Sequence, residues 1–414
     1  TVASCPETDG MQLTARYLTE GLPGTGGTIK ERVEDFQVEE LPLYPPSGRG
    51  EHTFFEITKA GISTFQAVRV IARALGVPPN RLGYAGLKDA QAITCQVLSV
   101  HGILPETVAA LDLPNIDVMW AERHNSKLKI GHLRGNRFTV RVRDVGRSAL
   151  TQCGAILEVL AQKGVPNRFG SQRFGLRGNS GQLGQAVVKG EARGFIRDFL
   201  GVPHRCENEV VQAARSRFDA DQWEEALRLL PNSMADERKA LHTLIRTQGD
   251  YDQAYSSVPK RLKVFLLSAY QSALFNKVVD ARLETLDRVQ FGDLAMKHPG
   301  RSVFRVEDER IEQARVVRFE ISPTGPIFGY KMIQPHGQQG KLEADLLADE
   351  GLVLEDFRVG GGIKAKGQRR ALRFQIHDPE LWFDDGLMLR FWLLPGCYAT
   401  VVLDEIIKPC RSEA

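Results

Sequence analysis

Strand-type and helix-type segments follow one another along this chain without the regular alternation that a doubly wound parallel sheet requires. Residues 52–59 (HTFFEITK) have strand composition, and residues 138–142 alternate apolar and polar side chains with the period of two that is typical of a half-buried strand. By contrast, residues 148–163 and about 262–286 carry apolar side chains at helical spacing. This order predicts an α+β fold.

The length of 414 residues exceeds that of a typical single domain and predicts two domains. Hydrophobic residues make up 42% and charged residues 25% of the chain, so it can bury a sizeable core. The composition shifts near residues 191–203 and again across the Gly/Lys-rich stretch 359–367. We therefore expect an insertion into the first domain between these two positions.

The segment GYAGLKDAQAITCQ, residues 83–96, holds the main candidate for a catalytic side chain. Gly83 and Gly86 indicate a loop before the strand-like run 93–100, which places Asp89 in that loop or at its edge. An Asp after a glycine-rich turn is usually a turn former or a cap, so its residue type alone assigns no function.

The complete segment closely resembles the A-G-x-K-D-x-x-A-x-T-x-Q signature of the TruD family of pseudouridine synthases. Further segments resemble the family in the same order along the chain, so that the resemblance extends from about residue 28 to the C-terminus. It is weakest between about residues 195 and 260. The fixed signature positions are filled by Ala85, Gly86, Lys88, Asp89, Ala92, Thr94 and Gln96, and the other segments are residues 33–40, 124–140, 165–175, 268–279 and 390–407.

This resemblance implies the pseudouridine synthase fold, a mixed and largely antiparallel sheet flanked by helices, with an inserted TruD-specific α/β domain. The catalytic domain is then expected to comprise residues 1–192 and 369–414, and the insertion residues 193–368. It also implies an isomerase that converts uridine to pseudouridine in tRNA, with uridine 13 as the family target. Some family members also modify other RNAs.

In the family, the Asp of the signature is the nucleophile, and it corresponds to Asp89. Family residues that contact the substrate correspond to Phe36, Asn167 and Tyr398. Tyr398 stands where the family commonly has Phe, and its ring can still stack on a base. Phe36 can alternatively be a core residue, and Asn167 can serve only to stabilise its turn.

Pseudouridine synthases generally place a cation near the nucleophile, and Lys30 is our candidate because it precedes the EDF-like motif. Lys88 adjoins Asp89 but can point away from it. The chemistry involves neither net redox change nor hydrolysis, so we expect no cofactor.

Basic residues are concentrated in three runs, although the net charge is only +3. Residues 123–147 contain eight Lys or Arg against the single acid Asp144, and residues 159–190 and 358–373 contain no acid. If two or three of these runs face one cleft, they form a phosphate-binding surface; otherwise they are separate solvated faces. The candidate RNA contacts are Arg134, Arg137 and Arg173.

The sequence lacks the patterns of several other classes of site. The glycine-rich stretches 21–30 and 359–367 have neither P-loop nor G-x-G-x-x-G spacing, and no Cys or His cluster indicates a metal. No apolar stretch is long enough to span a bilayer, and the first ten residues lack the pattern of a signal peptide. We therefore expect a cytoplasmic, monomeric protein whose partner is tRNA and which binds no membrane, metal or nucleotide cofactor.

Two other functional classes remain open from the sequence. One is a non-catalytic RNA-binding protein or RNA chaperone on the same fold, although the presence of Asp89 argues against loss of catalysis. The other is a carboxylate-metal nuclease, but no acidic residues cluster around Asp89 in the sequence. Activity in the presence of a chelator separates a synthase from such a nuclease.

Overall fold

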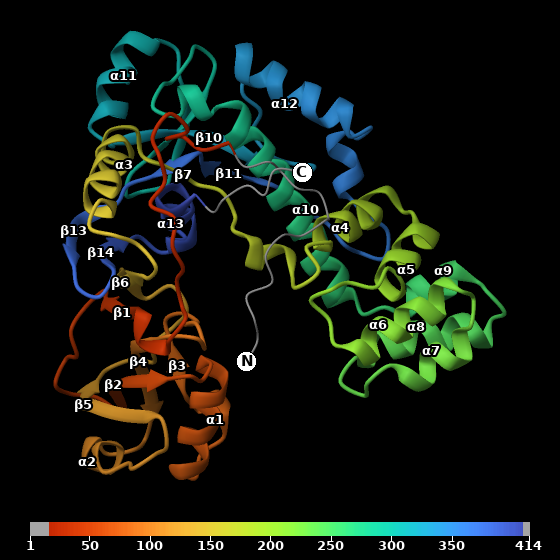
Figure 1. Cartoon of the computed structure of the whole chain (residues 1–414), viewed down its shortest axis with the longest axis horizontal. Helices are drawn as coiled ribbons and strands as arrows, with labels where there is room; N and C mark the ends of the chain where they lie inside the picture. The colour runs from red at the N-terminus through yellow and green to blue at the C-terminus, as the bar shows by residue number, and fades with distance from the viewer. Residues whose placement is uncertain (1–15, 409–414) are drawn as a thin grey trace. The chain divides into compact units, whose positions relative to one another are not determined.

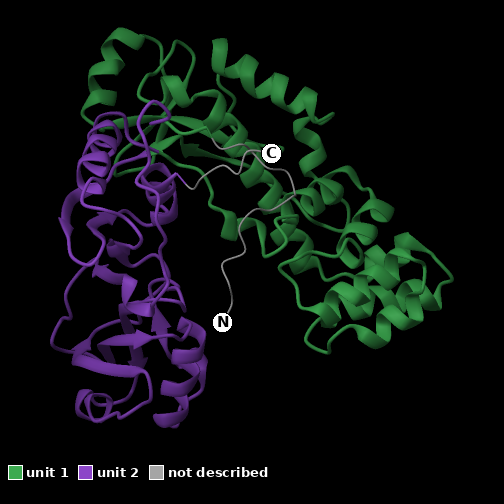
Figure 2. Cartoon of the chain, in the orientation of Figure 1, with its two compact units in different colours: residues 1–18, 166–373 green, residues 19–165, 374–414 purple. Residues whose placement is uncertain are grey.

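The computed structural model describes residues 16–408, whose helices and strands are shown in Figure 1. They form two compact units, coloured separately in Figure 2. Unit 2 comprises residues 19–165 and the described residues from 374 onwards, and unit 1 comprises residues 16–18 and 166–373. The first ten residues, on which the expectation about a signal peptide depends, lie outside the described part of the chain.

Unit 2 is built on an eight-stranded sheet with the order β13-β14-β6-β1-β4-β2-β5, in which β3 also pairs with β4. Only β1 and β4 run parallel; the other neighbours are antiparallel. The mixed, largely antiparallel sheet expected from the sequence is therefore confirmed. The strands are β1 (Phe36–Pro42), β2 (His52–Ala60), β3 (Gly83–Tyr84), β4 (Ile93–His101), β5 (Ile116–His124), β6 (Leu133–Val142), β13 (His377–Phe383) and β14 (Leu387–Leu393).

Helix α1 (Thr64–Ala74) follows β2 directly and begins with a capping box. The Ser63 hydroxyl accepts a hydrogen bond from the Gln66 backbone N–H, and Gln66 Oε1 accepts one from the Ser63 backbone N–H at 2.8 Å. Val68 and Ile71 of this helix pack into the buried cluster formed by β2 and β4. The other helices of unit 2 are α2 (Pro105–Ala109), α3 (Ala149–Lys163) and α13 (Ala399–Ile407).

The two faces of this sheet differ in composition, because successive side chains of a strand point to opposite faces and directly paired residues share a face. Glu40 of β1 pairs with Asn136 of β6, and Glu39 pairs with Arg137. Lys59 of β2 pairs with Thr94 of β4, which in turn pairs with Val38 of β1. Lys59, Glu40 and Asn136 therefore lie on one face, and Glu39 and Arg137 on the other.

Unit 1 combines helices with a four-stranded antiparallel sheet of order β11-β10-β8-β9. Its main core is formed by apolar residues of the helices from α4 to α10, including Phe195, Leu241 and Tyr270. The strands are β8 (Leu294–Lys297), β9 (Val303–Arg305), β10 (Ile321–Ile327) and β11 (Gln368–Ala371). The helices are α4 (Ser180–Lys189), α5 (Ala192–Leu200), α6 (Glu209–Asp219), α7 (Trp223–Leu229), α8 (Ala235–Arg246), α9 (Tyr251–Ser257), α10 (Lys260–Ala281), α11 (Glu309–Val317) and α12 (Gly337–Asp349).

The compact units divide the chain at different positions from those expected for the domains. The second boundary, after residue 373, is within a few residues of the expected one, but the first lies after residue 165 rather than 192. Helix α4 belongs to unit 1 because it packs closely on α10: a Cβ added at Gly184 would lie 2.1 Å from the carbonyl oxygen of Leu266. The boundaries fall within two paired short strands, β7 (Val165–Pro166) and β12 (Arg373–Phe374).

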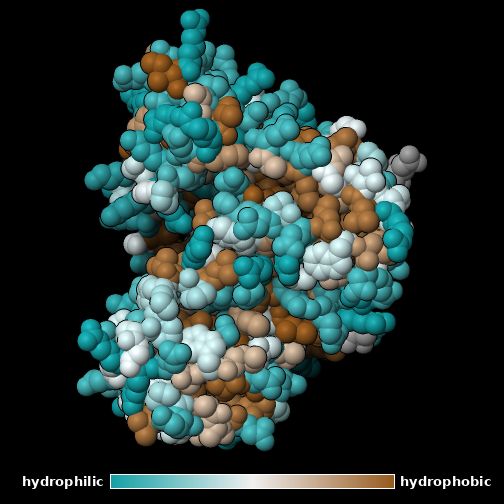
Figure 3. Space-filling view, turned by 90° about the vertical axis from the view of Figure 1, so that its left-hand side faces the viewer, coloured by the Kyte–Doolittle hydropathy of each residue, from teal (hydrophilic) through white to brown (hydrophobic). Residues whose placement is uncertain are grey.

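Hydrophilic residues dominate the molecular face shown in Figure 3, with hydrophobic residues in smaller groups between them. No helix within residues 16–408 combines the length and the hydropathy that crossing a membrane requires.

Candidate active site

Asp89 lies in the loop between β3 and β4, and this loop is held by hydrogen bonds to neighbouring elements. The Thr64 hydroxyl, at the start of α1, accepts a hydrogen bond from the Lys88 backbone N–H at 2.9 Å and donates one to Gln96 Oε1 at 3.0 Å. The carbonyl of Ala85 accepts a hydrogen bond from the Gly131 N–H at 2.8 Å. These contacts connect the loop to a helix, a strand and a second loop.

Four further signature residues are buried around the loop. Ala85, Ala92, Thr94 and Gln96 are each at most 1% exposed. The side chains of Thr94 and Gln96, two residues apart on β4, point to the same face of the sheet. Lys59 of β2 pairs with Thr94 and lies on that face too. The signature therefore describes the support of the loop, whereas the side chain of Asp89 remains 41% exposed.

The side chain of Lys88 forms an ion pair with Glu40 rather than with Asp89. Its Nζ donates to Glu40 Oε2 at 2.6 Å and to Asn136 Oδ1 at 2.8 Å, and both members of the Lys88–Glu40 pair are almost fully buried. Burial raises the pKa of Glu40 above its ordinary value, and the Lys88 charge opposes that rise. Lys88 thus ties the loop that carries Asp89 to β1 and β6.

Lys30 forms the ion pair with Asp89. Its Nζ lies 3.0 Å from Asp89 Oδ2, and its side chain is 17% exposed. The backbone of Lys30 has a φ of 61°, a left-handed conformation that costs free energy for a residue with a Cβ. A strained backbone of this kind persists only where the surrounding structure holds it.

The segment that carries Lys30 is held by parts of the chain that are distant in sequence. The N–H groups of Thr25 and Gly26 donate to the carbonyls of Ile406 and Ile407, at the end of α13, at 2.9 and 3.0 Å. Thr28 forms a β-bridge with Arg143, just beyond β6. These contacts orient the segment so that the Lys30 side chain reaches Asp89.

Phe36 lies beneath Lys30 and is only 2% exposed. The Lys30 Nζ is 4.2 Å from the centroid of its ring, and the ring of Phe138 packs edge-on against it at 6.1 Å. A base could stack on Phe36 only if Lys30 moved, so in this structure the ring supports the cation. The preceding Asp35 is buried and pairs with Arg143, whose hydrogen bonds hold the pKa of the Asp35 carboxyl below its usual value.

Lys59 is a residue of this site that our sequence analysis did not identify. It is 1% exposed, and its Nζ donates to the carbonyl of Asp89 at 3.0 Å and to that of Ile62 at 2.6 Å. Burial lowers its pKa to about 8, an effect that the charge of Asp89 opposes and that of Lys88 reinforces. The available signal was a lysine at the end of a strand-like segment, but the sequence did not show which face it occupies.

The other expected substrate contacts differ in their placement. Tyr398 belongs to unit 2, as Asp89 does, and lies directly before α13 with 37% of its surface exposed. Asn167 belongs to unit 1 and is 6% exposed. Its Nδ2 donates to the Ala371 carbonyl at 2.8 Å, and its Oδ1 accepts from Arg370 at 2.5 Å. The amide of Asn167 therefore stabilises its own unit in this structure.

The three candidate RNA contacts do not form one surface within a single unit. Arg137, in unit 2, pairs with Glu39 at 2.9 Å on the sheet face opposite to Asn136, and Arg134 packs over the ring of Trp392 at 5.2 Å. Arg173 belongs to unit 1, where it donates to the hydroxyls of two serines of α10.

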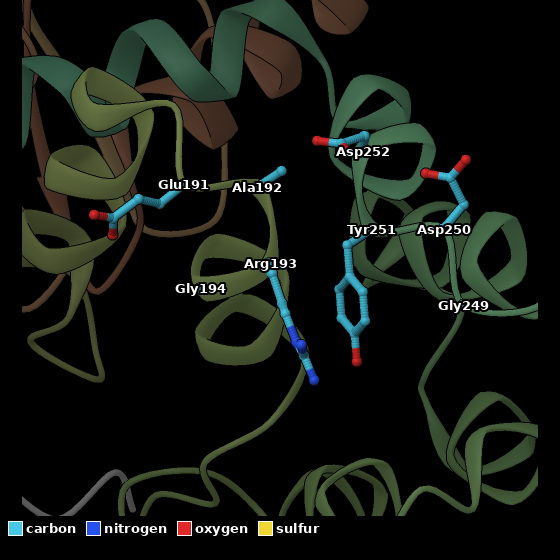
Figure 4. A pocket seen from close by; sticks show the side chains of 8 residues that line it. All are labelled: Glu191, Ala192, Arg193, Gly194, Gly249, Asp250, Tyr251 and Asp252. Atoms are coloured by element: carbon cyan, nitrogen blue, oxygen red, sulfur yellow. The ribbon is translucent and has the colours of Figure 1, made fainter.

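A pocket of about 610 Å³ lies in unit 1, where the start of α5 meets the start of α9 (Figure 4). Arg193 and Tyr251 extend side by side in it, with the guanidinium carbon 5.4 Å from the ring centroid. None of the expected site residues lines this pocket. Across residues 16–408, no three His, Cys, Asp or Glu side chains are grouped so as to hold a metal ion.

Comparison with known proteins agrees with the resemblance seen in the sequence. Residues 12–406 match the family tRNA pseudouridine synthase D (TruD). The tRNA pseudouridine synthase D of Geobacter metallireducens is 47% identical over 96% of this chain and 99% of the relative, and that of Geobacter sulfurreducens is 45% identical over 95% and 97%. A crystal structure of TruD from Methanosarcina mazei superimposes with a TM-score of 0.84 at 27% identity, covering 95% of this chain and 96% of that chain. The chain therefore belongs to the TruD family of tRNA pseudouridine synthases.

Proposed function

We propose that this protein isomerises uridine 13 of tRNA to pseudouridine and that Asp89 is the nucleophile. The observation that carries the proposal is the geometry of Asp89: a partly exposed carboxylate, paired with Lys30 at 3.0 Å, on a loop whose backbone is held by buried groups. The family relationship supports the reaction and the tRNA substrate.

The reaction breaks the bond between ribose C1′ and uracil N1, turns the base, and joins C1′ to C5. An ionised carboxylate can attack the sugar or the base, or remove a ribose proton to form a glycal, and each route needs Asp89 as a base or nucleophile. Since Lys30 pairs with one carboxylate oxygen, it orients the group and supplies positive charge where negative charge changes during the reaction. We expect the reaction to need no cofactor, because it is neither a redox reaction nor a hydrolysis.

The target base must leave its stack to reach Asp89, so it needs a new stacking partner. We propose Tyr398 for this role, because its ring is exposed in unit 2, whereas Phe36 is covered by Lys30. Asn167 is proposed as a contact to the base edge, which would require its present hydrogen bonds to be exchanged.

For the tRNA backbone we propose contacts with Arg134, Arg137 and Arg173, as the distribution of basic residues suggested. We further propose that the protein acts as a monomer in the cytoplasm. These proposals rest on the tRNA substrate and on the sequence.

The deciding experiment is to map pseudouridine in tRNA after incubation with the protein, by mass spectrometry or by chemical modification and primer extension. We expect pseudouridine at position 13 with the parent protein and none with Asp89→Asn, which keeps the side-chain size but removes the charge. Asp112→Asn, a change at an exposed site, is the matched control and should leave activity intact. The nucleophile assignment would be wrong if Asp89→Asn formed pseudouridine at a substantial rate, and an RNA-binding protein without catalysis would bind tRNA and leave it unmodified.

A further inference from the structure

Lys59 is a buried cation that connects two loops at the candidate active site. It lies near the end of β2, on the sheet face that carries Glu40 and Asn136. Its ammonium donates to the carbonyl of Ile62, in the turn between β2 and α1, and to the carbonyl of Asp89. One side chain thus joins the turn that precedes α1 to the loop that carries the proposed nucleophile.

The hydrogen bond from Lys59 completes the fixation of the Asp89 backbone. The N–H of the preceding residue, Lys88, donates to the Thr64 hydroxyl at 2.9 Å, and the Asp89 carbonyl accepts from Lys59 at 3.0 Å. The Lys88 N–H belongs to the peptide before Lys88 and the Asp89 carbonyl to the peptide after Asp89, so the two contacts hold the backbone on both sides of these two residues. Because the Asp89 carbonyl adjoins the Asp89 Cα, the hydrogen bond from Lys59 restrains the direction of the Cα–Cβ bond and with it the position of the carboxylate.

A buried ammonium at this position is costly for stability. Among the described residues no carboxylate forms an ion pair with Lys59, whose acceptors are the two neutral carbonyls. Removing a cation from water without an ion-paired partner is unfavourable, although the charge of Asp89 partly offsets the cost, and an apolar side chain of similar length would avoid it. A purely structural role therefore explains Lys59 less well than a role in the reaction.

We propose that Lys59 is a positioning residue for the reaction, acting through the backbone of Asp89. The inference rests on the proposed role of Asp89 as nucleophile. Small displacements of a reacting group cost much of the rate, because the attacking atom must be held close to its target in the correct direction. Lys59 is shielded from solvent, so its effect reaches the substrate through Asp89, whose carbonyl it holds and with whose charge it interacts.

The test is Lys59→Met, which removes the donor and the charge but retains an unbranched side chain. We expect kcat on tRNA to fall about ten- to a hundred-fold, while KM and the melting temperature stay close to those of the parent. The matched control is Lys263→Met, at a lysine of unit 1 that is 8% exposed and lies over the ring of Tyr255. That variant removes a buried lysine elsewhere and should keep the parent kcat.

A second variant, Lys59→Gln, retains N–H donors without the charge and should recover part of the lost kcat. If Lys59→Met does not fold, Lys59→Leu takes its place as the variant without a donor. A kcat within two-fold of the parent in a folded Lys59 variant that lacks the donor overturns the inference, and so does a Gln variant no better than a folded Met variant. An equal loss of kcat in Lys263→Met also overturns the inference. If the parent forms no pseudouridine, the proposed function is wrong. If the parent is active and the Lys59 variants have the same kcat, the proposed function stands and the positioning role of Lys59 is wrong.

Discussion

Replacing Lys59 with Met should change how the stability of unit 2 depends on pH. Burial lowers the pKa of Lys59 from its ordinary value of 10.5 to about 8 in the folded protein. Between these two values the unfolded chain binds more protons at this residue than the folded chain does. The parent protein should therefore gain stability from this group as pH rises from about 8 towards 10.5, and the Met variant should lack that gain.

The size of the effect follows from the pKa difference. One pKa unit corresponds to 1.36 kcal/mol, so the full effect is about 3 kcal/mol, of which about 2 to 3 kcal/mol falls between pH 7 and pH 10. The conversion applies without a large correction for solvent because Lys59 is 1% exposed. At pH 7 the Met variant should be about as stable as the parent, because loss of the buried charge offsets loss of the two hydrogen bonds.

Urea unfolding monitored by tryptophan fluorescence can measure the free energy of unfolding of unit 2 separately. Of the four tryptophans, only Trp223 belongs to unit 1, so a Trp223→Phe background leaves reporters in unit 2 alone. The parent and Lys59→Met are compared in that background at pH 7 and pH 10, and other titrating groups cancel in the difference. Lys129→Met, at an exposed lysine, controls for the loss of one positive charge.

The expected result is a difference in unfolding free energy between parent and variant that changes by about 2 to 3 kcal/mol from pH 7 to pH 10. A difference that is the same at both pH values would refute the reasoning, because it would mean that Lys59 titrates alike in the folded and unfolded chain. A change of equal size in Lys129→Met would show that net charge is responsible.

Three further predictions concern the substrate. Lys30→Met should lower single-turnover rates about ten- to thirty-fold, because an ion pair with a partly exposed carboxylate is worth about 1–2 kcal/mol. Lys30→Arg should retain more activity, and equal rates in Lys30→Met and the parent would contradict the role of Lys30. The activity of Tyr398→Phe should stay within a few-fold of the parent, whereas Tyr398→Ala should lose about 1–3 kcal/mol of base stacking. An Ala variant that melts early but modifies tRNA normally when folded would exclude stacking. Arg173→Glu should weaken tRNA binding and reduce its salt dependence, measured by filter binding from low to high salt, and an unchanged slope would remove Arg173 from the interface.

The sequence was sufficient for features that depend on neighbouring residues. The alternation of apolar and polar residues at 138–142 reports one buried face, and the structure has β6 there with Phe138, Val140 and Val142 buried. Helical spacing predicted a helix at 148–163, where α3 lies, and the glycines at 83 and 86 predicted the loop that carries Asp89. Such patterns are visible locally because the period of a helix or strand decides which side chains can share a face.

Only the tertiary structure decided which distant residues meet at Asp89. Lys30 is 59 residues away in sequence and reaches Asp89 because the end of α13 and the residue after β6 hold its segment. The inward direction of Lys59 depends on how β2 pairs with β4, and a shift of one residue in that pairing would turn the lysine to the other face. The same dependence separates Asn136 from Arg137, which are adjacent in sequence but lie on opposite faces. Strand register and loop contacts arise from interactions across the whole unit, so local patterns in the chain do not reveal them.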